Sequence, residues 1–193
     1  IATVIATALG TLAALGLSRP HMPYKGLIMA ILISPMIVPL IITAAGMFFF
    51  YARINLVYTF TGVILAHVAL ATPFVVITVT ATLVGFDMNM VKAAQSLGAK
   101  PMRTFFKVIM PLILPGIISG ALFAFITSFD EVVIVMFMAS IDQLTIPKQM
   151  WAGIRQEISP VILCMATCLV LLSIFLLTTC LLYTSDAADE SRG

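Results

Sequence analysis

The sequence predicts an all-α membrane protein, built as a bundle of several apolar helices. Of its 193 residues, 62% are hydrophobic and only 9% are charged, whereas an ordinary soluble domain carries about 25% charged residues. The mean hydropathy is +1.17, and the apolar residues gather in stretches close to the roughly 20 residues that a transmembrane helix needs. The composition therefore excludes a soluble enzyme, a nucleic-acid-binding module and a disordered chain. The net charge of +2 is too small to indicate an electrostatic partner.

Five stretches are long and apolar enough, or nearly so, to cross a bilayer. The second contains Pro35 and Pro39, which membrane helices tolerate where neighbouring helices satisfy the freed carbonyls. The three cysteines all lie in the last stretch, and their spacing indicates neither a disulfide framework nor a metal site. In chain order the five stretches cover residues 1–17, 26–50, 56–84, 112–138 and 161–182.

Both ends of the chain are expected to differ from a complete native protein. Ile1 leads directly into an apolar run, without the charged segment and cleavage site of a signal peptide. Because five spans is an odd number, we expect one preceding helix to be missing. Residues 184–193 form a small polar tail, which we expect to be a sequencing artefact, with a short disordered tail as the alternative. The transmembrane domain is therefore expected to cover residues 1–183.

The basic residues predict the orientation of the spans, because cytoplasmic loops carry an excess of Lys and Arg. The loops at 18–25 and 85–110 lie on the same side by parity and hold six basic residues between them, against three on the other side. The six-residue side is therefore expected to be cytoplasmic. The three opposite residues are Arg53, Lys148 and Arg155.

The segment 85–111 is too polar and too regular to be a simple linker. We expect a first helix that ends at Gly98, because glycine commonly follows the last helical residue. Pro101 fits the first turn of a second helix, where its missing N–H costs nothing. That helix carries an apolar stripe, and Pro111 marks the start of the next span. The stripe consists of Met102, Phe105, Phe106 and Ile109.

Two roles fit this segment. Ala93 and Ala94 give the first helix a flat face of small side chains, against which another protein can pack closely. The alternative is an amphipathic helix that lies on the lipid surface, but the alanine pair and the glycine turn are unnecessary for that role. No GxxxxGK[ST] phosphate-binding loop is present, so we expect that the chain cannot hydrolyse ATP by itself. Transport would then be passive, driven by an ion gradient, or driven by a separate ATPase.

Charged residues within or near the membrane are rare and usually functional. Asp130 and Glu131 interrupt the fourth stretch on its outer side, where they can line a pathway and attract a cation. Alternatively, both lie in water at the outer interface or pair with basic residues there. Because adjacent helical residues point about 100° apart, we expect at most one of them to face the pathway. His67, inside the third stretch, is interpreted as a hydrogen-bonded core residue.

The loop resembles a known family pattern. Inner-membrane permeases of binding-protein-dependent ABC importers carry a cytoplasmic motif of the form EAA-x3-G-x9-I-x-L-P. Here Ala93-Ala94, Gly98 and Pro111 match it in identity and spacing, while Lys92 replaces the Glu, Val108 the Ile and Met110 the Leu. The stretches at 74–87, 128–137 and 145–162 are similar to spermidine/putrescine permeases, so the resemblance covers most of 1–183.

The resemblance implies a six-span bundle of the type I ABC importer permease kind, of which five spans are present. It implies the translocation subunit of an ATP-driven importer for polyamines or a similar small cation, multi-pass in the bacterial inner membrane. The loop at about 87–110 then couples to the ATPase subunits. A homologous permease is the second partner, and a periplasmic binding protein contacts the outer loop at 140–160. The ATPase-coupling residues are Lys92, Ala93, Ala94, Gly98, Val108 and Pro111.

Three other functions stay open. A permease of the same kind for another small solute fits the same residues. An ion-coupled secondary transporter predicts inverted repeats with paired discontinuous helices, which the sequence does not display. An intramembrane enzyme needs a catalytic constellation such as HExxH, and none is present. We therefore expect a protein that is not an enzyme, with no cofactor, no metal and no nucleic-acid partner.

Overall fold

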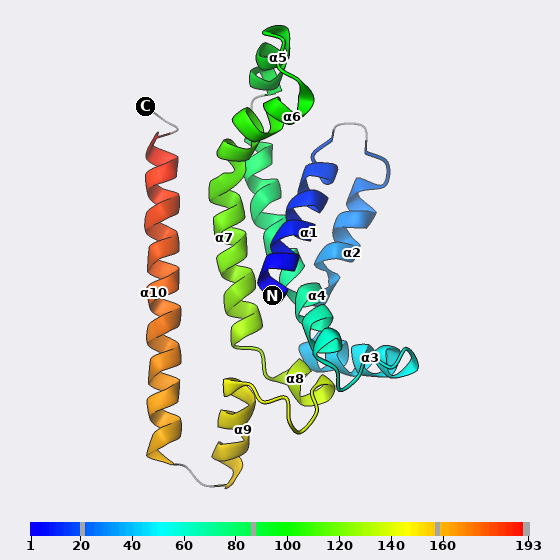
Figure 1. Ribbon diagram of the computed structural model, residues 1–193, viewed down its shortest axis with the longest axis vertical. Coiled ribbons are helices and arrows are strands. Elements are labelled where there is room, and N and C mark those ends of the chain that lie inside the picture. The colour runs from blue at the N-terminus through cyan, green and yellow to red at the C-terminus, as the bar shows by residue number, and fades with distance from the viewer. Residues whose placement is uncertain (20–21, 86–87, 157–158, 191–193) are drawn as a thin grey trace.

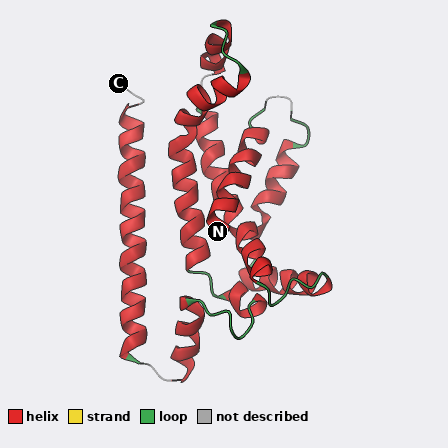
Figure 2. Ribbon diagram, viewed as in Figure 1, coloured by secondary structure: helices red, strands yellow, loops and turns green. Residues whose placement is uncertain are grey.

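The computed structural model describes residues 1–19, 22–85, 88–156 and 159–190, and within these ranges the chain is helical and has no β-strand (Figures 1 and 2). The prediction of an all-α fold is confirmed. The helices are α1 (Ala2–Leu17), α2 (Lys25–Ile37), α3 (Leu40–Arg53), α4 (Phe60–Val84), α5 (Met88–Ser96), α6 (Pro101–Thr104), α7 (Met110–Phe129), α8 (Val133–Met138), α9 (Ile146–Gln156) and α10 (Pro160–Glu190), with a π-helical segment at Phe105–Ile109 between α6 and α7.

The centre of the bundle is the packing of α1, α4 and α7. Small residues let these helices approach closely, which is how membrane helices associate. A Cβ added at Gly10 of α1 would lie 2.6 Å from the Val75 Cβ, and one added at Gly120 of α7 would lie 2.9 Å from the Val75 Cα. Glycine is therefore required where α1 and α7 each meet α4. The buried apolar residues here are Ala2, Ala6, Ala14, Val68, Ala71, Val75, Val79, Ile113 and Ala124.

The long helices match three of the five predicted spans. In the described part of the chain, three helices are long and apolar enough to cross a membrane: Phe60–Val84, Pro101–Phe129 and Pro160–Cys180. Helix α1 is apolar but shorter, with 16 residues. Helix α10 extends to Glu190, so the polar tail is helical over 184–190 rather than disordered.

The second predicted span, 26–50, is not one straight helix. It breaks into α2 and α3, which meet at an angle of 107°. Val38 at the break is extended, with φ −72° and ψ 134°, as a residue before a proline prefers. Pro39 has no N–H to continue the ladder of α2. The described chain has four candidate spans if this bent pair is counted as one span, and three otherwise.

The fourth predicted span, 112–138, begins close to the start of α7 at Met110, but its far end is wrong. A continuous helix already begins at Pro101, passes through the π-helical segment and ends at Phe129. Pro111 lies in the first turn of α7, as predicted, although the helix also continues back to Pro101. Its missing N–H removes one α-helical bond, and the π-helical segment directly before it accommodates that loss. After Phe129 the chain turns and forms the separate helix α8.

Different short helices lie at the two ends of the bundle. Helices α5 and α6 lie at one end, together with the C-terminal end of α1 and the N-terminal end of α2 (Figure 1). Helices α3, α8 and α9 lie at the other end. The two loops that hold six basic residues are thus at the same end of the molecule, as the predicted orientation requires.

Candidate functional site

Gly98 forms the turn between α5 and α6, as predicted. Its φ is +81°, in the left-handed region that glycine adopts without penalty. The Gly98 N–H donates to the Gln95 carbonyl at 2.9 Å, and the Ala99 N–H donates to the Ala94 carbonyl at 3.1 Å. These two bonds are the Schellman arrangement that ends a helix. A Cβ at Gly98 would meet no atom within 4 Å, so the requirement for glycine is conformational.

The second helix of the loop is physically continuous with a membrane span. Lys100 precedes it in an extended conformation, and Pro101 occupies its first turn, as predicted. From Pro101 the helix runs for 29 residues to Phe129. At about 1.5 Å per residue, this helix is roughly 43 Å long. The loop and the far end of α7 therefore belong to one continuous helix.

The predicted coupling residues differ in their exposure. Lys92, Ala93, Gly98 and Pro111 are exposed, whereas Ala94 and Val108 are partly buried. The two alanines thus do not form one exposed face: Ala94 turns toward the rest of the chain and Ala93 turns outward.

The apolar stripe of the second helix is also divided. Met102 and Phe106 are 67% and 56% exposed, while Phe105 is partly buried and Ile109 packs against the core. The π-helical segment at 105–109 explains this division, because it changes the angular spacing on which a single stripe depends.

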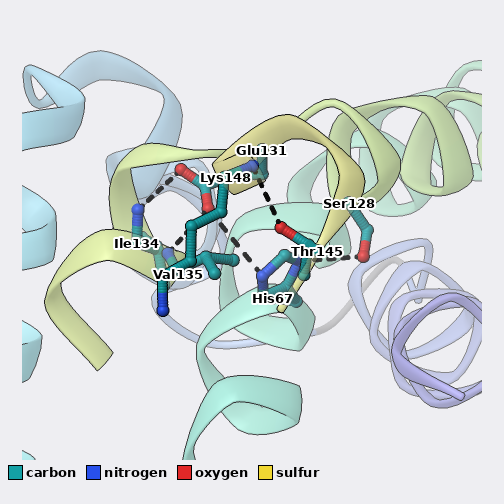
Figure 3. Close-up of polar contacts among 7 residues, drawn as sticks. All are labelled: His67, Ser128, Glu131, Ile134, Val135, Thr145 and Lys148. Carbon is teal, nitrogen blue, oxygen red and sulfur yellow. Dashed lines mark hydrogen bonds and ion pairs between the residues drawn. The ribbon is translucent and has the colours of Figure 1, made fainter. Parts of the chain in front are cut away.

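Glu131 is a buried helix cap (Figure 3). Its Oε1 accepts a hydrogen bond from the Ile134 N–H at 2.7 Å, and its Oε2 accepts one from the Val135 N–H at 3.2 Å. Both donors belong to the first turn of α8, where N–H groups lack partners within the helix. A carboxylate is also favoured at this end by the helix dipole. The chemistry of Glu131 is therefore used within the fold.

His67 connects α4 to this cap. Its Nδ1 is 2.9 Å from the Ser128 Oγ, and its Nε2 is 3.8 Å from the Glu131 Oε2 (Figure 3). The interpretation of His67 as a hydrogen-bonded core residue is confirmed. Its proximity to Glu131 could not be predicted, because 64 positions separate the two residues and no local pattern links them. The pair fixes the turn between α7 and α8 against α4.

Asp130 lies between Ser128 and Glu131 in the sequence and is exposed. It ends α7, where its N–H donates to the Ile126 carbonyl at 3.0 Å. In the part of the chain that the structure describes, no Lys or Arg forms an ion pair with it. Lys148 donates instead to the carbonyls of Ser140 and Gln143, at 2.8 and 3.3 Å. The structure thus separates the two adjacent carboxylates into a buried cap and an exposed group.

A cleft of about 600 Å³ opens beside Asp130. One wall is the break between α2 and α3 at residues 35–40, and the other is formed by α4 and the end of α7. Leu70 and Phe74 contribute apolar surface, and Asp130 and Glu131 both line the cleft. Only Asp130 is exposed there, because the Glu131 carboxylate is buried as the cap of α8; that at most one of the two faces a transport pathway stays a prediction.

The outer loop contains α9, an amphipathic helix that carries Trp151. The Arg155 guanidinium lies 5.6 Å from the centre of the Trp151 ring, a distance at which a cation and an aromatic ring attract each other. Residues 157 and 158 of the predicted binding-protein contact lie outside the described residues. Among those described, no three His, Cys, Asp or Glu side chains gather to hold a metal ion.

Comparison with known proteins supports the resemblance of this chain to inner-membrane permeases. A family model described as "Binding-protein-dependent transport system inner membrane component" matches residues 6–183. The spermidine/putrescine transport system permease protein PotC of Haemophilus influenzae is 31% identical over 183 residues, which cover 95% of this chain and 71% of that protein. The putrescine transport system permease protein PotI of Escherichia coli K12 is 37% identical over 103 residues, 53% of this chain and 37% of that protein.

A solved structure shares the fold. A chain from an inward-facing structure of the MetNI methionine ABC transporter superimposes with a TM-score of 0.73, covering 96% of this chain and 89% of that chain. Its sequence identity is 17%, so the similarity concerns the fold alone. The predicted permease architecture is confirmed.

Proposed function

Since the chain belongs to the family of binding-protein-dependent transport system inner membrane components, we propose that it forms the translocation pathway of an ATP-driven importer for a polyamine or a similar small cation. It is a multi-pass protein of the bacterial inner membrane. Its relatives are permease subunits rather than enzymes. The proposed partners are two ATPase subunits, a homologous permease and a periplasmic binding protein that contacts the outer loop at 140–160.

One observation supports the mechanism above all: a single helix joins the loop to the cleft. Pro101 is at one end of this helix and Phe129 at the other, directly before Asp130. In the proposed cycle, ATP binding closes the ATPase subunits and moves the docked α5. The helix from Pro101 then tilts as a rigid body, a common form of switching motion, and moves the wall of the cleft that carries Asp130.

The cleft suits a small cation with an apolar body. The Asp130 carboxylate supplies the negative charge, while Leu70 and Phe74 offer apolar surface to a methylene chain. The last turn of α2 ends in the opposite wall, and a helix C-terminus also favours positive charge. Glu131 contributes indirectly, by holding the turn in which Asp130 lies. The names of the relatives PotC and PotI indicate spermidine and putrescine as the first substrates to test.

The turn at Gly98 provides the test. Proteoliposomes that contain the assembled transporter are loaded with ATP, and uptake of radiolabelled spermidine is measured with the binding protein outside. Gly98→Pro fixes φ near −65°, reorients α5 and is expected to abolish ATP-driven uptake. Gly26→Ala is the matched control, because a Cβ there meets nothing within 4 Å and α2 lies outside the loop.

Three outcomes would contradict the proposal. Full uptake by Gly98→Pro would show that the loop does not transmit the work of the ATPase. Uptake by the chain without any ATPase subunit would favour an ion-coupled transporter. Efficient uptake of an uncharged solute, with no competition by spermidine, would keep the importer mechanism and overturn the substrate class.

A further inference from the structure

Helix α5 presents a defined outward face. Val91 and Ala94 are partly buried against the rest of the chain, whereas Lys92, Ala93 and Ser96 are exposed. At 100° per residue, the three exposed residues share one side of the helix, opposite the buried pair. Asn89 is exposed on the same side, so the outward face carries one cation, one small apolar side chain, one hydroxyl and one amide. The orientation of this face is set by the packing of α5 against α6 and the π-helical segment at Phe105–Ile109.

The surface around this face is positively charged. Residues 88–111 contain four basic residues and no acidic residue. Lys92, Lys100, Arg103 and Lys107 are all exposed, and none of them forms an ion pair with a residue that the structure describes. The segment 85–111 also holds Asp87, so its net charge is +3, which attracts a negatively charged partner and repels a positive one.

A protein surface fits this face better than lipid does. A helix that lies on a membrane needs a broad apolar face directed at the acyl chains, but the outward face of α5 carries Lys92 and Ser96. The helix also projects beyond the adjacent ends of α1 and α2 (Figure 1). Leu97, directly after α5, is 89% exposed and offers one apolar contact beside the cations. This combination suits a pocket on a folded protein whose rim is acidic.

The charge of Lys92 is opposite to that of the glutamate at this place in the motif that the loop resembles. We propose that α5 docks in a groove of the ATPase subunit whose rim is acidic, with the Lys92 ammonium paired to a carboxylate of that subunit. This inference rests on the proposed function and names the chemistry of its partner surface. A carboxylate opposite Lys92 makes the pairing specific, because a basic residue at that place would repel the ammonium.

Carbodiimide cross-linking of the assembled transporter tests the contact directly, since this reagent joins an amine to a carboxylate only when the two already touch. Mass spectrometry is expected to identify a peptide in which Lys92 is linked to an Asp or Glu of the ATPase subunit. Lys92→Gln should lose that product. A cross-link from Lys100 or Lys107 with none from Lys92 would overturn the proposed pairing.

Binding measurements with the chain in nanodiscs separate the possible outcomes. Lys92→Glu is expected to weaken binding of the isolated ATPase subunit about tenfold or more, with Lys92→Gln between it and the unchanged chain. Lys25→Glu, the same charge change at the same end of the molecule but outside the loop, should bind normally. Adding salt should weaken binding by the unchanged chain more than by Lys92→Gln.

Equal or tighter binding by Lys92→Glu would overturn the inference while the importer function stands. Loss of binding to anionic vesicles by Lys92→Glu, with ATPase affinity unchanged, would assign the lysine to lipid and overturn it as well. If the unchanged chain binds no ATPase subunit at all, the proposed function itself fails.

Discussion

Mutation of Glu131 should lower the stability of the protein, whereas mutation of Asp130 should lower uptake and leave stability unchanged. In Glu131→Ala, the N–H groups of Ile134 and Val135 lose their acceptors in a site where both residues are fully buried. Each buried unsatisfied donor costs about 1–3 kcal/mol. Because the bond to Val135 is long, at 3.2 Å, we take the lower part of that range for it and expect a loss of about 3 kcal/mol in total. Glu131→Gln keeps one acceptor oxygen and should lose about half as much.

Asp130→Asn should leave stability unchanged within about 0.5 kcal/mol, because the side chain is exposed and unpaired among the described residues. It should instead weaken uptake of spermidine, since it removes the exposed negative charge that lines the cleft.

Unfolding in mixed micelles can be followed through Trp151, because the chain contains a single tryptophan. The free energy of unfolding is compared among Glu131→Ala, Glu131→Gln, Asp130→Asn and the unchanged chain, and uptake is measured on the same preparations. A loss of stability in Asp130→Asn as large as in Glu131→Ala would refute the division of roles. So would a normal stability of Glu131→Ala.

Two further experiments test the packing that positions the cleft. A double-mutant cycle of His67→Ala and Ser128→Ala should give a coupling energy of about 1 kcal/mol, since the Nδ1 and Oγ atoms are 2.9 Å apart; a coupling near zero would show that the bond is absent. Gly120→Ala should destabilise the protein by about 1–3 kcal/mol, because its Cβ would lie 2.9 Å from the Val75 Cα. Gly46→Ala, where a Cβ meets nothing within 4 Å, is its control and should be neutral or stabilising by up to about 1 kcal/mol; equal losses in the two variants would contradict the close approach of α7 to α4.

The loop could be predicted from the sequence because its signals are local. Gly98 ends a helix by its own conformational freedom, and Pro101 begins one by its missing N–H. The lipid-spanning character of α4 and α10 follows in the same way from uninterrupted apolar residues. These features depend on neighbours within a few positions, so no knowledge of the tertiary structure is needed.

The cleft could not be predicted, because it depends on where helices stop. The apolar run from 112 to 138 continues through the end of α7 at Phe129, so hydropathy alone conceals the turn in which Asp130 and Glu131 lie. The break at Val38 had a visible signal in the proline that follows it, but tolerance of prolines in membrane helices masked it. The contact between His67 and Glu131 arises only when α4 packs against α7.

The central claim is that the outward face of α5 is held by an ATPase subunit and that this contact drives transport. Ala93→Cys tests it most directly, since this residue is exposed on that face, in a background where Cys164, Cys168 and Cys180 are replaced by serine. With a cysteine in the groove of the ATPase subunit, oxidation is predicted to cross-link the two chains and to stop ATP-driven uptake, and a reductant should restore it. If Ala93→Cys reacts only with membrane-soluble reagents and never joins another subunit, the claim is contradicted.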